Sequence, residues 1–184
     1  MLRQENCSLR PMSPTDLDQV LAWRNSPRIR AAMFSDHIIT IEEHRAWFQK
    51  VQNSEGSKLL IFLLEDIAVG VVNITDIDFR HNHCFWGFYI GIEPAPSGTG
   101  LAMGYFALNY AFGELGIRKL CSEVIVSNTT SLRYHHRLGF YEEGQFREHV
   151  KKDGIYADVI RLACFRSDWE KVKRDIAQRC FGGE

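Results

Sequence analysis

Several features that would assign this chain of 184 residues to a particular class of protein are missing from its sequence. Its five cysteines include no CxxC pair, and their odd number does not suit a disulfide framework or a zinc site. With 22 Lys and Arg against 23 Asp and Glu, no basic excess favours nucleic acid binding. The longest apolar run, residues 59–64, is too short to cross a bilayer.

The N-terminal residues also lack the apolar core of a signal peptide, and unpaired cysteines suit a reducing compartment. We therefore expect a cytoplasmic protein without nucleic acid or membrane partners. His81 and His83 lie in a polar turn with no Cys or carboxylate at ligand spacing, so no metal is predicted. The length and ordinary composition favour one globular domain over residues 1–184.

The first half of the chain predicts helices followed by an antiparallel meander. Ser13 with Pro14, and the capping box that starts at Thr40, each open a segment with apolar residues at helical spacing. A short helical segment is expected near residues 29–34. Strands are predicted at residues 7–11, 58–64, 68–77 and 84–92.

After residue 92 the pattern changes to helices alternating with strands. Helices are predicted at residues 101–115, 128–138 and 168–179. Strands are predicted at residues 119–126, 141–151 and 155–165, the last two joined by a turn at Asp153-Gly154. The fold class is therefore α+β, with a mixed sheet that carries helices on its faces.

The loop Ser97-Gly98-Thr99-Gly100, between a predicted strand and a predicted helix, is the first candidate functional feature. Glycines let the backbone approach a ligand closely, and the free amides of a helix start favour an anion such as a pyrophosphate. A plain turn would have the same composition. No GK[ST] follows, so the loop is not a Walker A motif, and the preceding meander disfavours a dinucleotide fold.

A second motif begins at the end of a predicted strand and reads NTTSLRYHHRLGF from Asn128 to Phe140. Together the two motifs resemble the GNAT acetyltransferases, which have a glycine loop, a strand, and then N-x-x-S/A leading to a Tyr and a Gly-Phe. The resemblance spans nearly the whole chain. It implies the GNAT fold, a largely antiparallel twisted sheet of about seven strands with helices on both faces and a splay between the two central strands.

The resemblance also implies an acetyl-CoA-dependent N-acetyltransferase. The pantetheine arm would pair with the edge of one splayed strand, the glycine loop would bind the pyrophosphate, and Asn128 would hold pantetheine or cap the next helix. The cofactor-binding residues implied are Tyr89, Ile90, Gly91, Ile92, Ser97, Gly98, Thr99, Gly100, Leu101, Ala102, Asn128 and Ser131. Ser97 stands where the family usually has a basic residue or Gln, so backbone amides would carry more of the phosphate binding.

The general acid of the family is usually a Tyr seven residues after this Asn. That position is His135 here, and Tyr134 precedes it. Neighbouring helical residues diverge by about 100°, so the two side chains cannot point the same way. Either can protonate a leaving thiolate. The register favours His135, and Tyr134 is the alternative.

The N-terminal third resembles the RimJ/RimL-like branch and, within it, the amino-sugar acetyltransferases of pseudaminic acid biosynthesis. This resemblance rests on Trp23-Arg24-Asn25, Glu43-His44 and residues 70–79. It implies acetylation of the 4-amino group of a UDP-linked amino sugar, and it is compatible with a homodimer. The acceptor-binding residues implied are Arg24, Met33, His44, Thr75 and Tyr89.

Other features of the acceptor site stay open at this point. His44, Glu43 and His83 are candidates for the general base. Trp23, Trp47 and Trp86 can stack on a base or pack in the core. Asp76 stands where a basic residue can occur in the family. The alternative acceptors are a protein N-terminus and a polyamine, and the alternative class is an acyl-CoA sensor without catalysis.

Overall fold

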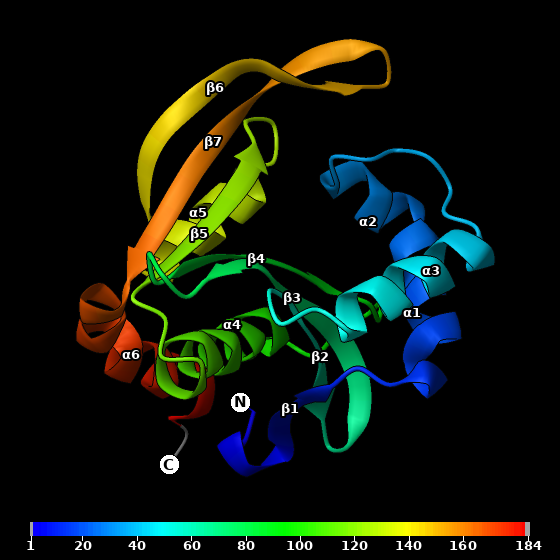
Figure 1. Ribbon diagram of the computed structural model, residues 1–184. Helices are drawn as coiled ribbons and strands as arrows, with labels where there is room; N and C mark the ends of the chain where they lie inside the picture. The colour runs from blue at the N-terminus through cyan, green and yellow to red at the C-terminus, as the bar shows by residue number, and fades with distance from the viewer. Residues whose placement is uncertain (1, 183–184) are drawn as a thin grey trace.

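The computed structural model describes residues 2–182, whose strands form one sheet in the order β1-β2-β3-β4-β5-β7-β6 (Figure 1). The β4–β5 pair is parallel, and all other neighbouring strands are antiparallel. The predicted α+β class and mixed sheet are confirmed. The strands are β1 (Cys7–Pro11), β2 (Lys58–Leu64), β3 (Ile67–Asp78), β4 (His83–Ile90), β5 (Lys119–Ile125), β6 (Tyr141–Lys152) and β7 (Ile155–Phe165).

The two central strands are hydrogen-bonded at one end only. Their parallel pairing joins the start of β4 to the start of β5 and stops after Phe85 and Cys121. From there β4 runs on to Ile90 and β5 to Ile125 as diverging strands, which confirms the predicted splay. Backbone groups on the diverging edge of β4 are open to pairing with an extended ligand.

Helices cover both faces of the sheet (Figure 1). One buried cluster joins the sheet to α4 and α6, and a second joins it to α1 and α3. Ile61 and Phe62 are both fully buried yet belong to different clusters, because neighbouring side chains of a strand point to opposite faces. The helices are α1 (Leu17–Asn25), α2 (Pro27–Ala32), α3 (Ile41–Gln52), α4 (Thr99–Asn109), α5 (Thr129–Arg137) and α6 (Arg166–Phe181).

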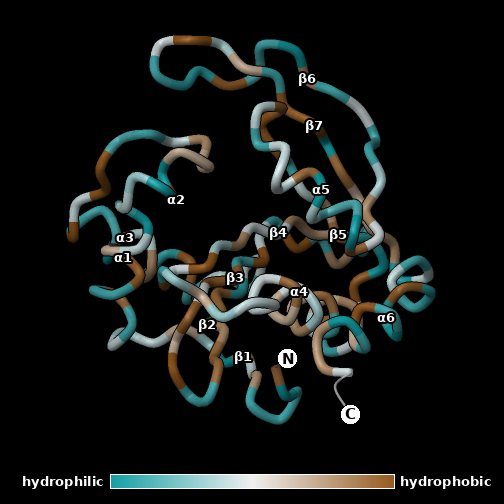
Figure 2. The backbone as a smooth tube through the Cα atoms, turned by 180° about the vertical axis from the view of Figure 1, so that it is seen from behind, coloured by the Kyte–Doolittle hydropathy of each residue, from teal (hydrophilic) through white to brown (hydrophobic). Residues whose placement is uncertain are grey.

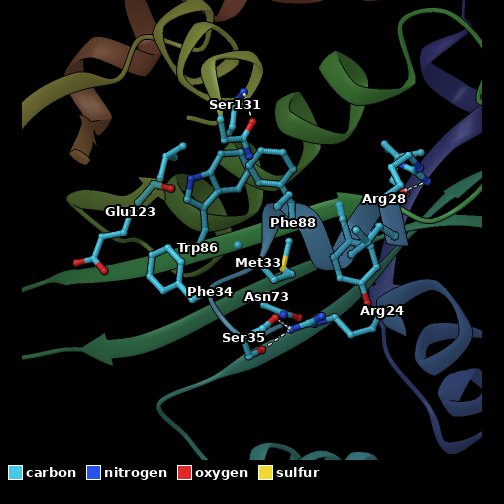
Figure 3. A pocket seen from close by; sticks show the side chains of 18 of the residues that line it. Arg24, Arg28, Met33, Phe34, Ser35, Asn73, Trp86, Phe88, Glu123 and Ser131 are labelled. Atoms are coloured by element: carbon cyan, nitrogen blue, oxygen red, sulfur yellow. Dashed lines mark hydrogen bonds between the residues drawn. The ribbon is translucent and has the colours of Figure 1, made fainter. Parts of the chain in front are cut away.

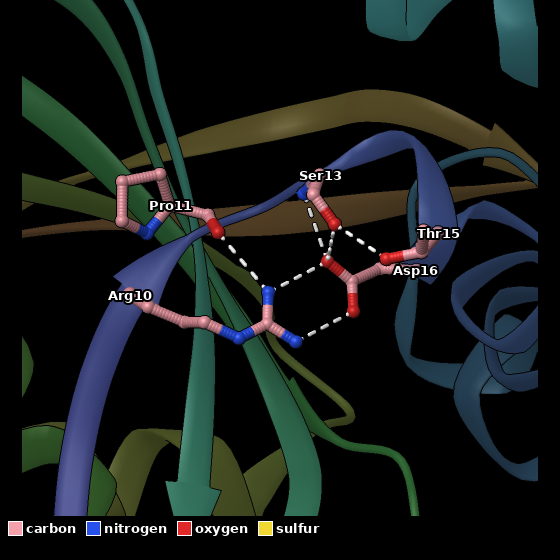
Figure 4. Close-up of polar contacts among 5 residues, drawn as sticks. All are labelled: Arg10, Pro11, Ser13, Thr15 and Asp16. Atoms are coloured by element: carbon pink, nitrogen blue, oxygen red, sulfur yellow. Dashed lines mark hydrogen bonds and ion pairs between the residues drawn. The ribbon is translucent and has the colours of Figure 1, made fainter.

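An ion pair between the partly exposed Arg10 and the buried Asp16 fixes the direction in which the chain leaves β1 for α1 (Figure 4). Both carboxylate oxygens of Asp16 accept hydrogen bonds from Arg10 at 2.7 Å, and the backbone N–H of Ser13 donates at 2.8 Å. These contacts lower the pKa of Asp16 to about 2, and the hydrogen bonds from Arg10 have the largest effect. The predicted cap at Ser13 is confirmed as a capping box with Asp16, which starts a 3₁₀ turn ahead of α1.

The β6–β7 hairpin extends from the sheet and curves toward α2 (Figure 1). Most residues of β6 are exposed, and the strand is largely hydrophilic in Figure 2. β7 instead buries Val159 and Leu162 in the body of the protein. Asp153 and Gly154 both have positive φ at the predicted turn, as a tight hairpin requires.

The predicted helix at residues 101–115 differs from the observed one at both ends. α4 begins earlier, at Thr99, because Gly98 takes a left-handed φ of 90° as its N-cap and the Thr99 N–H donates to the Pro96 carbonyl. Residues Tyr110–Glu114 form a π-helical turn. No helix within residues 2–182 combines the length and apolar character that a membrane span requires.

Candidate active site

A cavity of about 890 Å³ crosses the molecule between the N-terminal helices and α5, over the splay of β4 and β5 (Figure 3). On the α3 side its wall includes Arg24, Met33, Ser35 and His44. Its floor includes Asn73, Trp86, Phe88, Tyr89 and Ile90 from the central strands. On the α5 side the lining includes Gly100, Glu123, Asn128, Ser131, Tyr134 and His135.

Gly100 and the start of α5 form the anion-compatible end of the cavity. Gly100 lies in the first turn of α4, where the amides have no intrahelical acceptor, and a Cβ added to it would meet nothing within 4 Å. The Asn128 side chain accepts a hydrogen bond from the Ser131 N–H at 3.1 Å and caps α5. Two helix starts therefore meet one cavity, each able to attract negative charge.

The free edge of β4 already has one side-chain contact. Arg28 donates to the carbonyl oxygens of Ile90 at 3.0 Å and Gly91 at 3.3 Å, and it pairs with Glu93 at 2.9 Å. Arg28 is exposed, so it can leave this edge without exposing apolar surface. The strand itself ends at Ile90, two residues before its predicted end, because the Gly91 and Ile92 amides both converge on the Val69 carbonyl.

The two candidate acids make different hydrogen bonds. The Tyr134 hydroxyl donates to the Gly100 carbonyl at 2.7 Å, so its proton is already committed. His135 is buried, and its Nδ1 lies 2.8 Å from the Ser131 carbonyl. Because a carbonyl only accepts, Nδ1 carries the proton and Nε2 of the neutral ring carries the lone pair. This Nε2 is buried without a hydrogen-bond partner within the described residues.

Burial governs the ionisation of both residues. Desolvation lowers the pKa of His135 to about 4, although the bond to Ser131 opposes the shift, so the imidazole is neutral at pH 7. Aromatic rings surround it, since Trp86, Phe88 and Phe140 lie with centroids 5.0–5.6 Å away. Desolvation likewise raises the pKa of Tyr134.

The α3 side of the cavity contains an incompletely paired cation. Arg24 Nη2 donates to the Ser35 hydroxyl at 2.6 Å, while Nη1 is buried without a partner among the described residues. Figure 3 shows this guanidinium beside Asn73, whose Oδ1 is also buried and unpartnered in this part of the chain. Burial lowers the pKa of Arg24, which nevertheless stays protonated at pH 7.

His44 is a second neutral imidazole in the cavity lining. It is 3% exposed and stacks on Trp47 with ring centroids 5.2 Å apart. Desolvation is the main cause that lowers the pKa of His44. Its Nε2 has no partner among residues 2–182, whereas neighbouring Glu43 is engaged in the capping box with Thr40. Of these two neighbours, His44 is therefore the better placed to accept a proton.

Several predicted site residues do not line the cavity. Thr75 and the exposed Asp76 lie beyond Asn73 along β3, and Asn73 takes the lining position instead. His83 lies at the paired start of β4, away from the splay. Gly91 packs against Trp23, whose ring lies 2.0 Å from where a Cβ would be, so Trp23 serves packing. The remaining predicted residues outside the lining are Ile92, Ser97, Gly98, Thr99, Leu101 and Ala102.

Sequence reasoning missed Arg28, Ser35 and Asn73 as cavity residues. The signal for Asn73 was present, because a lone amide stands between the apolar residues Val72 and Ile74. Arg28 and Ser35 gave no such signal, since surface Arg and Ser are ordinary in a helical region. Within residues 2–182, no group of three or more His, Cys, Asp or Glu is arranged to hold a metal ion.

Known proteins share this architecture. The family described as "Acetyltransferase (GNAT) domain" matches residues 7–141, so the chain belongs to the GNAT acetyltransferase family. It is an acetyl-CoA-dependent N-acetyltransferase, and the names of its curated relatives, which are acetyltransferases, agree with this activity. The prophage-derived N-acetyltransferase YokL of Bacillus subtilis (strain 168) is 27% identical over 90% of this chain and 93% of its own length.

Acetyltransferase PseH of Campylobacter jejuni (strain 81-176) is 23% identical over 76% of this chain and 87% of its own length. A crystal structure of spermidine N-acetyltransferase from Vibrio cholerae, in complex with CoA and spermine, has a TM-score of 0.84 at 22% identity. That match covers 90% of this chain and 99% of the other. These similarities confirm the fold but do not single out the amino-sugar branch of the family.

Proposed function

We propose that this acetyltransferase acts on the amino group of an acceptor that carries negative charge elsewhere, namely the 4-amino group of a UDP-linked amino sugar. The observation that carries the proposal is the buried, unpartnered Nη1 of Arg24 in the cavity wall. A buried polar group without a partner is costly, and an anionic ligand atom would satisfy this one.

The carboxylates of the cavity lining favour the same class of acceptor. Glu43 accepts from the Thr40 N–H at 2.7 Å, and Glu123 is paired with Arg161 at 2.5 Å. Both carboxylates already make these contacts, and the positive charge of Arg28 is paired with Glu93. Arg24 adds a positive charge to the lining that is not paired with a carboxylate of the described residues. A polyamine would bring several ammonium groups to this cation, and like charges repel. The polyamine alternative is therefore disfavoured.

The donor side of the cavity suits acetyl-CoA. The amides in the first turn of α4, at Gly100, would bind the diphosphate. The pantetheine arm would extend along the free edge of β4 and take over the Ile90 carbonyl from Arg28. Gly91 N–H faces β3, so the alternating Ile90 N–H faces the splay, where it can stabilise the developing oxyanion.

The proton path follows from the hydrogen bonds of the two imidazoles. His44, neutral and unpartnered at Nε2, would take the proton from the incoming ammonium group. The free amine then attacks the thioester carbonyl carbon, and the C–S bond breaks as the amide forms. His135 Nε2 would accept the proton that nitrogen loses and deliver it to the departing thiolate. Tyr134 would hold the backbone at Gly100 in place.

A coupled thiol-release assay tests the acceptor class. The purified chain is given acetyl-CoA and, separately, a UDP-4-amino sugar, spermidine and a peptide with a free N-terminus. We expect the highest kcat/KM with the UDP-amino sugar. Faster turnover of spermidine or the peptide would contradict the proposed acceptor. Binding of acetyl-CoA without thiol release for any amine would favour the sensor alternative and overturn the proposal.

A further inference from the structure

The tip of the β6–β7 hairpin is fastened to the end of α2, more than a hundred residues earlier in the chain. The Lys152 ammonium donates to the carbonyl oxygens of Met33 at 2.7 Å and Arg30 at 3.0 Å, and also to that of Ala31. The Asp153 N–H donates to the Asp36 carboxylate at 3.1 Å. In Figures 1 and 2 the hairpin reaches across to α2 from the opposite side of the molecule.

These contacts meet a need of the short helix α2. The last carbonyl groups of a helix lack the usual intrahelical partner, and a lysine ammonium with three protons can donate to three acceptors. Of the three carbonyls bound by Lys152, that of Arg30 also accepts from the Met33 N–H at 3.1 Å. Lys152 is only partly exposed, and desolvation is the main cause that lowers its pKa. A partly desolvated ammonium strengthens bonds to carbonyls that would otherwise face water.

The segment that Lys152 fastens forms part of the cavity wall. Met33, Phe34 and Ser35 all line the cavity, whereas Lys152 does not (Figure 3). Phe34 and Ser35 are otherwise exposed and lie outside any helix or strand, so little else holds them. Ser35 in turn binds Arg24 at 2.6 Å. The hairpin tip is thus linked to the incompletely paired guanidinium of Arg24 by the hydrogen bond to Met33, the backbone of residues 33–35 and the hydrogen bond of Ser35.

We propose that Lys152 is a positioning residue, which holds the wall at residues 33–35 and thereby sets the orientation of Arg24 toward the acceptor. Lys152 touches neither substrate. Its loss would weaken acceptor binding, while the chemistry at His135 and the acetyl-CoA site, on the other side of the cavity, would stay intact. The orientation of Arg24 toward the acceptor rests on the proposed function, whereas the hold of Lys152 on residues 33–35 does not depend on which amine is the acceptor.

The experiment compares Lys152→Met with Lys151→Met in the full chain. Lys151 is the neighbouring exposed lysine of the same strand and lies over the Tyr156 ring, so it is a matched control. Amide hydrogen exchange is measured over residues 30–40 without any ligand. We expect exchange in Lys152→Met to be about tenfold faster, as the loss of one or two hydrogen bonds would give. Lys151→Met should match the wild type.

Kinetics then separate positioning from a general structural role. With the UDP-amino sugar as acceptor, Lys152→Met should raise the acceptor KM about tenfold and change kcat less than about twofold. The Kd of acetyl-CoA should not change, and Lys152→Arg should restore much of the KM. Unchanged exchange at residues 30–40, or equal losses in acceptor and acetyl-CoA binding, would overturn the inference. Because exchange needs no acceptor, it decides this point even if the UDP-amino sugar is not turned over.

Discussion

The Tyr134 hydroxyl donates a hydrogen bond of 2.7 Å to the Gly100 carbonyl and so ties α5 to the first turn of α4. The contact depends on Gly104, where a Cβ would lie 2.3 Å from the same hydroxyl oxygen. The anion-compatible helix start and the helix that carries His135 are therefore held as one unit. Tyr134 uses its proton for this contact, which leaves the adjacent imidazole as the better candidate for proton transfer.

The first prediction concerns these two neighbours. His135→Ala should lower kcat by about 100-fold or more, the usual range for loss of a general acid or base. Tyr134→Phe should lower kcat much less and mainly reduce thermal stability, because it removes the bond to Gly100. Steady-state kinetics and melting curves check both. His136→Ala, at an exposed position next to His135, is the control. The reverse ranking of the two kcat losses would assign the proton to Tyr134.

The second prediction tests the helix start at which we propose diphosphate binding. Gly100→Ala should weaken acetyl-CoA binding about tenfold, because its Cβ would project into space that the ligand needs. Stability should not fall, since nothing in the chain lies within 4 Å of that Cβ and Ala favours helix. Calorimetric titration and melting curves measure the two effects. Gly113→Ala, which is also unobstructed but outside the cavity lining, should leave the affinity unchanged.

The third prediction concerns the cation on the acceptor side. Arg24→Gln should raise the KM for an anionic acceptor at least about tenfold, as expected for the loss of one charge-assisted hydrogen bond. The Kd of acetyl-CoA should change little, because Arg24 lies across the cavity from the glycine loop. Arg45→Gln removes an exposed cation from α3 and serves as the control. A spermidine KM that falls in Arg24→Gln, with no change for the UDP-amino sugar, would count against the proposed acceptor.

The fourth prediction concerns stability and pH. The pKa of Asp16 is about 2 in the folded chain and about 4 when unfolded, so its ionised form stabilises the fold above about pH 4. This contribution, about 2 kcal/mol, is lost as pH falls from 4 toward 2. The free energy of unfolding of Asp16→Asn should therefore be about 2 kcal/mol lower than that of the wild type at pH 7. This difference should vanish near pH 2.

Urea unfolding at several pH values measures this difference in the free energy of unfolding. Asp18→Asn, which changes an exposed carboxylate two residues further on, in the first turn of α1, is the matched control and should have little effect at any pH. A difference between Asp16→Asn and wild type that persists undiminished at pH 2 would show that the ion pair with Arg10 is not its source.

Local patterns were enough to predict most of the elements. The capping boxes at Ser13 and Thr40 and the turn at Asp153-Gly154 are confirmed, because each depends on residues only a few positions apart. The early start of α4 and the early end of β4 escaped prediction. The early end of β4 depends on a contact with Val69 of a neighbouring strand. The early start of α4 is a local effect of Gly98 and Pro96, in a segment whose glycines and prolines predicted a loop.

The sequence alone determined the fold class, the glycine loop and the motif at Asn128, since these reside in short-range periodicity and spacing. Tertiary structure decided which side chains meet. It set the tautomer of His135 through Ser131, committed the Tyr134 proton to Gly100 and brought Lys152 to the end of α2. Tyr134 and Gly100 are 34 positions apart in the chain, and Lys152 and Met33 are 119 positions apart. Spacing along the chain carries no information about partners that only packing brings together.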